Sequence, residues 1–134
     1  MVRSRGRKAQ VCYSKLRRNL HANGNLAPEA RLLLHPFTIA NGGITAGLKV
    51  SVFPTSTGID LVRKGGQRMT HVPPLDPLSS LIENFQQRGG TIWACPPCVT
   101  SRGYSQEDLL DGIVTVGASA MHAEITEGAA TLSF

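Results

Sequence analysis

The sequence of 134 residues has no apolar stretch long enough to cross a lipid bilayer, which takes about 20 consecutive residues. It also lacks the apolar core of a secretory signal peptide near its first residue. Aromatic residues make up 5% of the chain, too few to form stacking platforms for single-stranded nucleic acid. Its three cysteines, an odd number, do not suggest an extracellular disulfide framework. These absences favour a cytoplasmic protein without membrane contact, in a compartment that keeps thiols reduced.

The motifs of common cofactor-dependent and hydrolytic enzymes are also missing. There is no dinucleotide-binding glycine fingerprint, phosphate-binding loop, H-E-x-x-H or G-x-S-x-G. A zinc site needs about four ligands, and the pair Cys95 and Cys98 supplies two. The other cysteine and the histidines are scattered singly: Cys12, His21, His35, His71 and His122. We therefore expect neither a metal nor an organic cofactor.

Acidic residues are missing from the start of the chain. All nine lie at or beyond Glu29, whereas seven of the 14 arginines and lysines precede it. The net charge of +5 therefore comes from the N-terminal segment. We interpret residues 1–25 as a basic, poorly ordered extension and residues 26–134 as one domain. We expect nucleic-acid contact only through this extension, by way of phosphates. An organellar targeting segment is the alternative, since the extension is Arg-rich and acid-free, although it has only two serines.

Segments typical of strands and helices alternate between residues 28 and 134. Pro28 and Glu29 suit the first turn of a helix, which Pro36 should kink. The predicted strands are 9–14, 48–53, 91–95, 113–119 and 129–134. The predicted helices are 28–47, a short one before Gly65, 77–90, 105–112 and 119–128. Because connections of this length join parallel strands, we predict an α/β fold. It is a single-domain, mainly parallel β-sheet with helices on both faces, layered as in flavodoxin-like folds.

Two loops follow strands where the working groups of open α/β sheets lie. One is PTSTG at 54–58, which we interpret as a helix N-cap because it lacks the lysine and glycine spacing of a phosphate loop. The other is CPPC at 95–98. Backbone N–H groups at the start of a helical turn, together with Arg102, should favour a thiolate at Cys95. Such a thiolate would be a nucleophile at neutral pH.

The CPPC motif has other interpretations. C-x-x-C suggests a dithiol redox pair, although here it follows a late strand, whereas thioredoxin-like folds carry it after an early one. It can also be half of a metal site, or two inert thiols in a structural turn. The residues alone leave these alternatives open.

Two long segments resemble the DsrE/DsrF-like family of small α/β proteins, which are related to the sulfur-relay subunits of tRNA thiolation and dissimilatory sulfur metabolism. They are GLKVSVFPTSTGIDLVRKGG and LSSLIENFQQRGGTIWACPPCVTSRGYSQEDLLDGIVTVGASAMHAEITEGAATLSF. The most telling pieces are CPPC followed by RGY, the segment DLLDG, and the closing EGAATLSF. The resemblance covers residues 28–134.

The resemblance implies a compact parallel-sheet domain that assembles as a homotrimer or hexamer. It places Cys95, ahead of Arg102–Gly103, at the position of the acceptor cysteine of the relay subunits. Cys95 would then accept sulfane sulfur as a persulfide and pass it on, with sulfur donor or acceptor proteins as partners. Cys98 is additional and would resolve the persulfide into a disulfide, and Arg102 would support the charge. The alternatives are a non-catalytic oligomeric binding module with a structural CPPC turn, or a dithiol redox protein using both cysteines.

Overall fold

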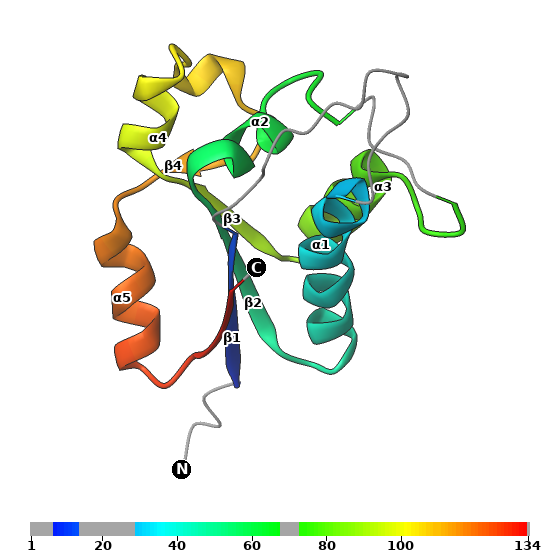
Figure 1. The fold of residues 1–134 in the computed structure, drawn as a ribbon. Coiled ribbons are helices and arrows are strands. Elements are labelled where there is room, and N and C mark those ends of the chain that lie inside the picture. The colour runs from blue at the N-terminus through cyan, green and yellow to red at the C-terminus, as the bar shows by residue number, and fades with distance from the viewer. Residues whose placement is uncertain (1–6, 14–28, 68–72, 134) are drawn as a thin grey trace.

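A computed structural model describes residues 7–13, 29–67 and 73–133. The described residues form a five-stranded parallel sheet in the order β4-β3-β2-β1-β5 (Figure 1). The strands are β1 (Lys8–Tyr13), β2 (Lys49–Pro54), β3 (Thr91–Ala94), β4 (Val114–Thr115) and β5 (Ala130–Ser133). The predicted α/β class with a parallel sheet is confirmed.

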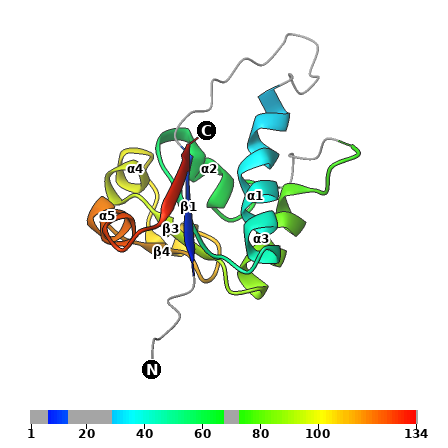
Figure 2. The ribbon, with the colours of Figure 1, turned by 90° about the horizontal axis from the view of Figure 1, so that it is seen from below.

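Helices cover both faces of the sheet. On one face α1 (Glu29–Thr45) packs beside α3 (Leu78–Gln87), and α5 (Ala118–Thr126) lies on the other (Figure 2). Two short helices follow the carboxyl ends of strands: α2 (Ile59–Val62) comes after β2, and α4 (Pro96–Ser101) after β3. Within the described residues, no helix combines the length and apolar character needed to span a membrane.

The main core lies between the sheet and the pair α1 and α3. Apolar residues recur at helical spacing in both helices, so each presents one buried stripe to the strands. Phe37 of α1 meets Phe85 of α3 edge to face, with ring centroids 5.9 Å apart. They pack against Val50 and Val52 of β2, which are also buried. Helix α1 runs on through Pro36, where the sequence predicted a kink.

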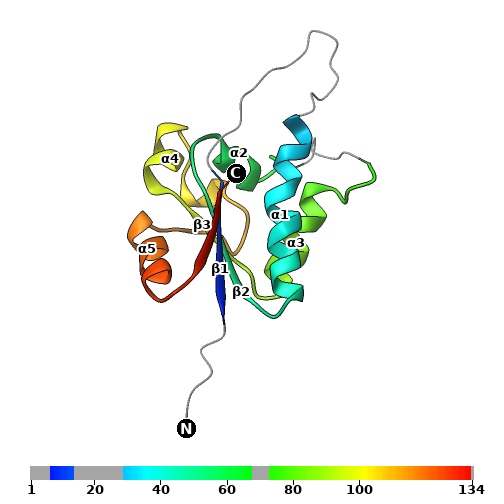
Figure 3. The same cartoon turned by 60° about the horizontal axis from the view of Figure 1, so that its bottom comes forward.

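Strand β1 lies inside the segment that the charge pattern assigned to an N-terminal extension. It pairs with β2 on one side and β5 on the other, so it is an inner strand (Figure 3). Lys8 at its start also forms an ion pair with Glu127, at the end of α5. The rest of the basic segment, residues 1–6 and 14–28, lies outside the described residues, and the domain boundary at residue 25 stays a prediction.

The region between β3 and α5 is less regular than predicted. The helix predicted at 105–112 is a single 3₁₀ turn, η2 (Gln106–Asp108), and the strand predicted at 113–119 pairs only over β4. The side chain of Gln106 binds backbone groups of this edge strand. Its Nε2 donates to the Ile113 carbonyl at 2.6 Å, and its Oε1 accepts from the Thr115 N–H at 3.0 Å. These backbone groups are therefore satisfied without a further strand.

Candidate functional site

Cys95 and Cys98 lie at the carboxyl edge of the sheet, as the sequence predicted. Cys95 follows the last residue of β3 and is the N-cap of α4, and Cys98 belongs to the first turn of that helix. The Val99 N–H donates to the Cys95 carbonyl at 3.0 Å, which closes this first turn. Both cysteines are half-buried and reduced. The Cys98 side chain interacts with the Cys95 thiol.

The expected low pKa of Cys95 is contradicted by the structure. Burial raises the pKa of the Cys95 thiol above its ordinary value, and the Cys98 side chain raises it further. The backbone N–H of Cys98 acts in the opposite direction. Pro96 and Pro97 occupy the first two positions of α4 and have no N–H, so the helix start offers few donors to the sulfur. Desolvation therefore outweighs hydrogen bonding in its effect on the pKa of Cys95.

Cys98 receives a hydrogen bond from the neighbouring loop. The backbone N–H of Ser56 donates to Cys98 Sγ at 3.2 Å. Ser56 begins η1 (Ser56–Gly58), which follows β2, and Thr55 before it makes no side-chain cap bond. Thr55 is the N-cap residue of η1, as the sequence predicted, and its carbonyl accepts from the Gly58 N–H at 2.9 Å. Because β2 and β3 are neighbours, the loops that follow them meet, and a backbone amide of one faces a thiol of the other.

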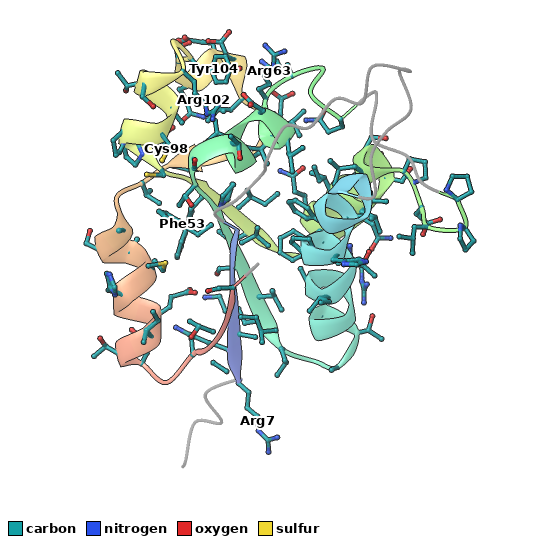
Figure 4. The ribbon with its side chains drawn as sticks, in the orientation of Figure 1. Arg7, Phe53, Arg63, Cys98, Arg102 and Tyr104 are labelled. Atoms are coloured by element: carbon teal, nitrogen blue, oxygen red, sulfur yellow. The ribbon has the colours of Figure 1, made fainter. Side chains whose placement is uncertain are left out.

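The described contacts of Arg102 are with Asp60 and Ser56, and its expected support of the charge of Cys95 stays a prediction. Its Nη1 donates to Asp60 Oδ2 at 2.8 Å and its Nε donates to the Ser56 carbonyl at 2.9 Å. The charge of the guanidinium is thus balanced by a carboxylate, and its second bond holds the loop that contacts Cys98. Figure 4 shows Arg102 between Cys98 and Tyr104.

Tyr104 completes the group around Asp60. Its hydroxyl donates to Asp60 Oδ1 at 2.8 Å, so both carboxylate oxygens are engaged. This bond is the main reason why the pKa of the Tyr104 phenol is raised, since ionisation would place a phenolate against a carboxylate. The Arg63 guanidinium lies over the ring of Tyr104, 5.4 Å from its centroid (Figure 4).

Sequence reasoning missed Ser56, Asp60 and Tyr104. The available signal was topological, because the segments PTSTGID and CPPCVTSRGY follow strands that are neighbours in a parallel sheet. Within the described ranges, no three His, Cys, Asp or Glu side chains are grouped so as to hold a metal ion. The third cysteine, Cys12, is in register with Phe53 of β2, and its side chain lies outside the described residues.

The chain can now be compared with known proteins. The sequence model of the DsrE/DsrF-like family matches residues 28–134. The chain belongs to the DsrE/DsrF-like family. The matched region includes β2, β3 and both loops of the thiol site.

Two archaeal relatives match about half of the chain. The uncharacterized protein MK0008 of Methanopyrus kandleri is 33% identical over 70 residues, which is 52% of this chain and 54% of the relative. The uncharacterized protein MJ0989 of Methanocaldococcus jannaschii is 30% identical over 66 residues, which is 49% of this chain and 54% of the relative. The chain thus spans about half the length of the curated relatives it matches.

Solved structures share the fold across nearly the whole chain. Protein MTH1491 of Methanobacterium thermoautotrophicum, titled a protein of unknown function, has a TM-score of 0.68 at 18% identity and covers 96% of this chain and 99% of its own. The YchN protein of E. coli has a TM-score of 0.66 at 16% identity, covering 95% and 99%. At these identities the likeness concerns the fold alone.

Proposed function

We propose that this DsrE/DsrF-like protein handles sulfane sulfur, which Cys95 accepts as a persulfide and passes on. The observation that carries the proposal is the pair of reduced, interacting thiols beyond β3, at the carboxyl edge of a parallel sheet. Membership of a family related to sulfur-relay subunits supports it. No organic cofactor is needed, because the sulfur is bound to the thiol itself.

The transfer is a thiol exchange without net oxidation. Cys95 gives up its proton, and its sulfur attacks the terminal sulfur of a donor persulfide, R–S–SH. The donor's S–S bond breaks, R–S⁻ leaves, and it takes up the proton. The products are Cys95–S–SH and R–SH. An acceptor thiol then attacks the terminal sulfur of Cys95–S–SH in the same way, which returns Cys95 to its free form.

Cys98 provides a second way to discharge the sulfur. Its thiolate attacks the inner sulfur of Cys95–S–SH, a Cys95–Cys98 disulfide forms, and HS⁻ leaves. A small-molecule thiol then reduces the disulfide and restores both cysteines. The direct interaction between the two side chains supports this step.

The raised pKa of Cys95 has a consequence for its partners. A neutral thiol is a poor nucleophile, so Cys95 reacts slowly with stray disulfides and oxidants. Transfer therefore depends on a donor protein that brings its persulfide directly to Cys95 and takes up the proton. Donor and acceptor proteins, assembly as a homotrimer or hexamer and a cytoplasmic location are parts of the proposal.

Intact-mass analysis after treatment of the reduced protein with a persulfide donor tests the proposal. We expect one added sulfur in the wild type and none in Cys95→Ser. The Cys98→Ser variant should keep the added sulfur longer than the wild type, because the internal discharge is lost. Cys12→Ser is the matched control and should behave like the wild type. No added sulfur on the wild type at any donor concentration contradicts the proposal.

A dithiol redox pair is the second candidate, favoured by the interaction of the two thiols. It predicts loss of two hydrogens under a mild oxidant, in a protein that takes up no sulfur from the donor. If neither treatment changes the mass, the CPPC turn is structural and the protein is better explained as a binding module.

A further inference from the structure

Ser56 has an unusual backbone conformation. Its φ of 50° makes it the one non-glycine residue with a positive φ among the residues that the structure describes. A side chain in this left-handed region is strained, and it persists where the surrounding structure holds it. Such strain is typical of functional sites, so the contacts that hold Ser56 are informative.

Asp60 and Arg102 hold Ser56 in place. The Arg102 Nε donates to the Ser56 carbonyl at 2.9 Å, and Arg102 Nη1 donates to Asp60 at 2.8 Å. Both side chains are largely covered, with exposed fractions of 24% for Arg102 and 14% for Asp60. Tyr104 binds the other oxygen of Asp60 and so fixes the carboxylate. The planar guanidinium of Arg102 therefore binds two residues at once. It joins Ser56, in the loop after β2, to Asp60, at the start of α2.

The strained turn directs an amide at a thiol. With its carbonyl held by Arg102, Ser56 presents its N–H to Cys98 Sγ at 3.2 Å. A hydrogen bond from an N–H becomes stronger when the acceptor is ionised. The Cys98 sulfur thus receives a backbone donor from the loop after β2, whereas Pro96 and Pro97, at the start of α4, have no N–H to offer Cys95.

We propose that Asp60 is a positioning residue which, through Arg102, holds the Ser56 amide against Cys98 and so makes Cys98 the attacking thiol of the pair. This proposal rests on the proposed function, in which Cys98 discharges the Cys95 persulfide, and it names the groups that govern that step. Asp60 and Arg102 touch neither sulfur in the described contacts and act through the Ser56 backbone.

Alkylation by iodoacetamide at neutral pH, followed separately at Cys95 and Cys98 by peptide mass spectrometry, tests the proposal. In the wild type we expect Cys98 to react faster than Cys95. Arg102→Lys keeps the charge but loses the two-edged contact, and Asp60→Asn loosens Arg102 while leaving its charge free. Both variants should lower the alkylation rate of Cys98 by about threefold to tenfold, which is the effect of weakening one hydrogen bond to an ionised group. The alkylation rate of Cys95 should not change.

Ser56→Gly distinguishes positioning from a general loss of structure. Glycine keeps the N–H and adopts a positive φ without strain, so it needs less support from Arg102. Introduced into Arg102→Lys or Asp60→Asn, it should restore much of the Cys98 rate. Arg88→Lys and Asp76→Asn are the matched controls, because they make the same chemical changes away from the thiols. They should react like the wild type.

Three outcomes overturn the proposal. The alkylation rate of Cys98 is unaffected by Arg102→Lys, it is higher in Asp60→Asn than in the wild type, or Ser56→Gly does not restore it in these variants. The second would mean that the charge of Arg102 matters more than the position of the amide. The assay uses no sulfur donor, so its result is independent of persulfide transfer. If the variants behave as expected but the wild type takes up no sulfur, the positioning role stands and the proposed function fails.

Discussion

Burial raises the pKa of Cys95, and Pro97 leaves that thiol without a capping donor that could offset it. An N-cap side chain accepts hydrogen bonds from the N–H groups of the second and third helical residues. In α4 the second residue is Pro97, which has no N–H, and the third is Cys98, whose N–H lowers the pKa of Cys95. One donor does not offset the burial that raises this pKa. The thiolate fraction at neutral pH is therefore below that of an ordinary cysteine.

Replacing Pro97 by alanine should therefore activate Cys95. Pro97→Ala supplies the missing N–H and should lower the pKa of the Cys95 thiol, raising its alkylation rate at neutral pH by about threefold to tenfold. In the wild type the rate should keep rising as the pH passes the ordinary thiol range, and in the variant the profile should move to lower pH. Pro96→Ala is the control, since a first-position N–H is not a capping donor. Equal profiles for both variants would contradict this account of Cys95.

The positions of Cys95 and Cys98 were predictable, and their environment was not. A strand followed by CPPC places two thiols at the carboxyl edge of a parallel sheet. Arg102 binds Asp60, which lies 42 positions away in the sequence. It also binds the carbonyl of Ser56, whose backbone conformation is one that serines rarely adopt. Local sequence carries no signal for such a contact, so the sequence analysis could relate Arg102 only to the nearby Cys95.

The η2 turn shows how a short element is stabilised by its ends. The Asp108 carboxylate accepts from the Ser105 N–H at 2.8 Å and from the Ser105 hydroxyl at 3.0 Å. These two bonds, the backbone one first, lower the pKa of Asp108. A carboxyl with a lowered pKa in the folded state stabilises the fold above its unfolded pKa. This contribution disappears as the pH falls through the folded value.

Asp108→Asn should therefore be less stable than the wild type at neutral pH and closely similar to it in acid. Urea unfolding at pH about 7 and about 2 measures both differences. Asp111→Asn is the matched control. The Asp111 carboxylate is fully exposed and lies 3.7 Å from Lys64, so its loss should change the free energy of unfolding little at either pH. If Asp108→Asn lowers the free energy of unfolding equally at both pH values, the contribution of Asp108 does not come from its ionised carboxylate.

Helices and strands were predicted well where apolar residues recur at a regular spacing over several turns, as in α3. They were predicted poorly around β4, at the edge of the sheet. Helix α3 has four buried apolar residues at helical spacing and ends just before Gly89–Gly90, so its limits were readable. The apolar stretch IVTV near β4 reads as a longer strand. The strand is short because α5 begins at Ala118. The Gln106 side chain binds backbone groups of this edge strand, a contact that cannot be read from local sequence.

For the whole molecule, alternation of strands and helices was sufficient to predict the class and the strand at 9–14, whereas the charge pattern placed that strand in an extension. The described part of the basic segment contributes β1, whose neighbours β2 and β5 come from the middle and the end of the chain. Strand order in a parallel sheet depends on contacts between distant segments. A composition argument, which treats residues 1–25 as one unit, cannot detect that six of them form an inner strand.

Deletion of residues 1–13 should therefore destroy the fold. Both β2 and β5 would lose a partner, and their backbone groups along that edge would be left unpaired in a sheet covered on both faces. We expect the truncated chain to lose cooperative thermal unfolding, measured by circular dichroism. Deletion of residues 1–6 is the control, because it keeps every described strand pair and the bond from the Lys49 N–H to the Arg7 carbonyl at 3.0 Å. A cooperative transition of similar midpoint after removal of residues 1–13 would show that β1 is dispensable, and it would support a domain that begins near residue 26.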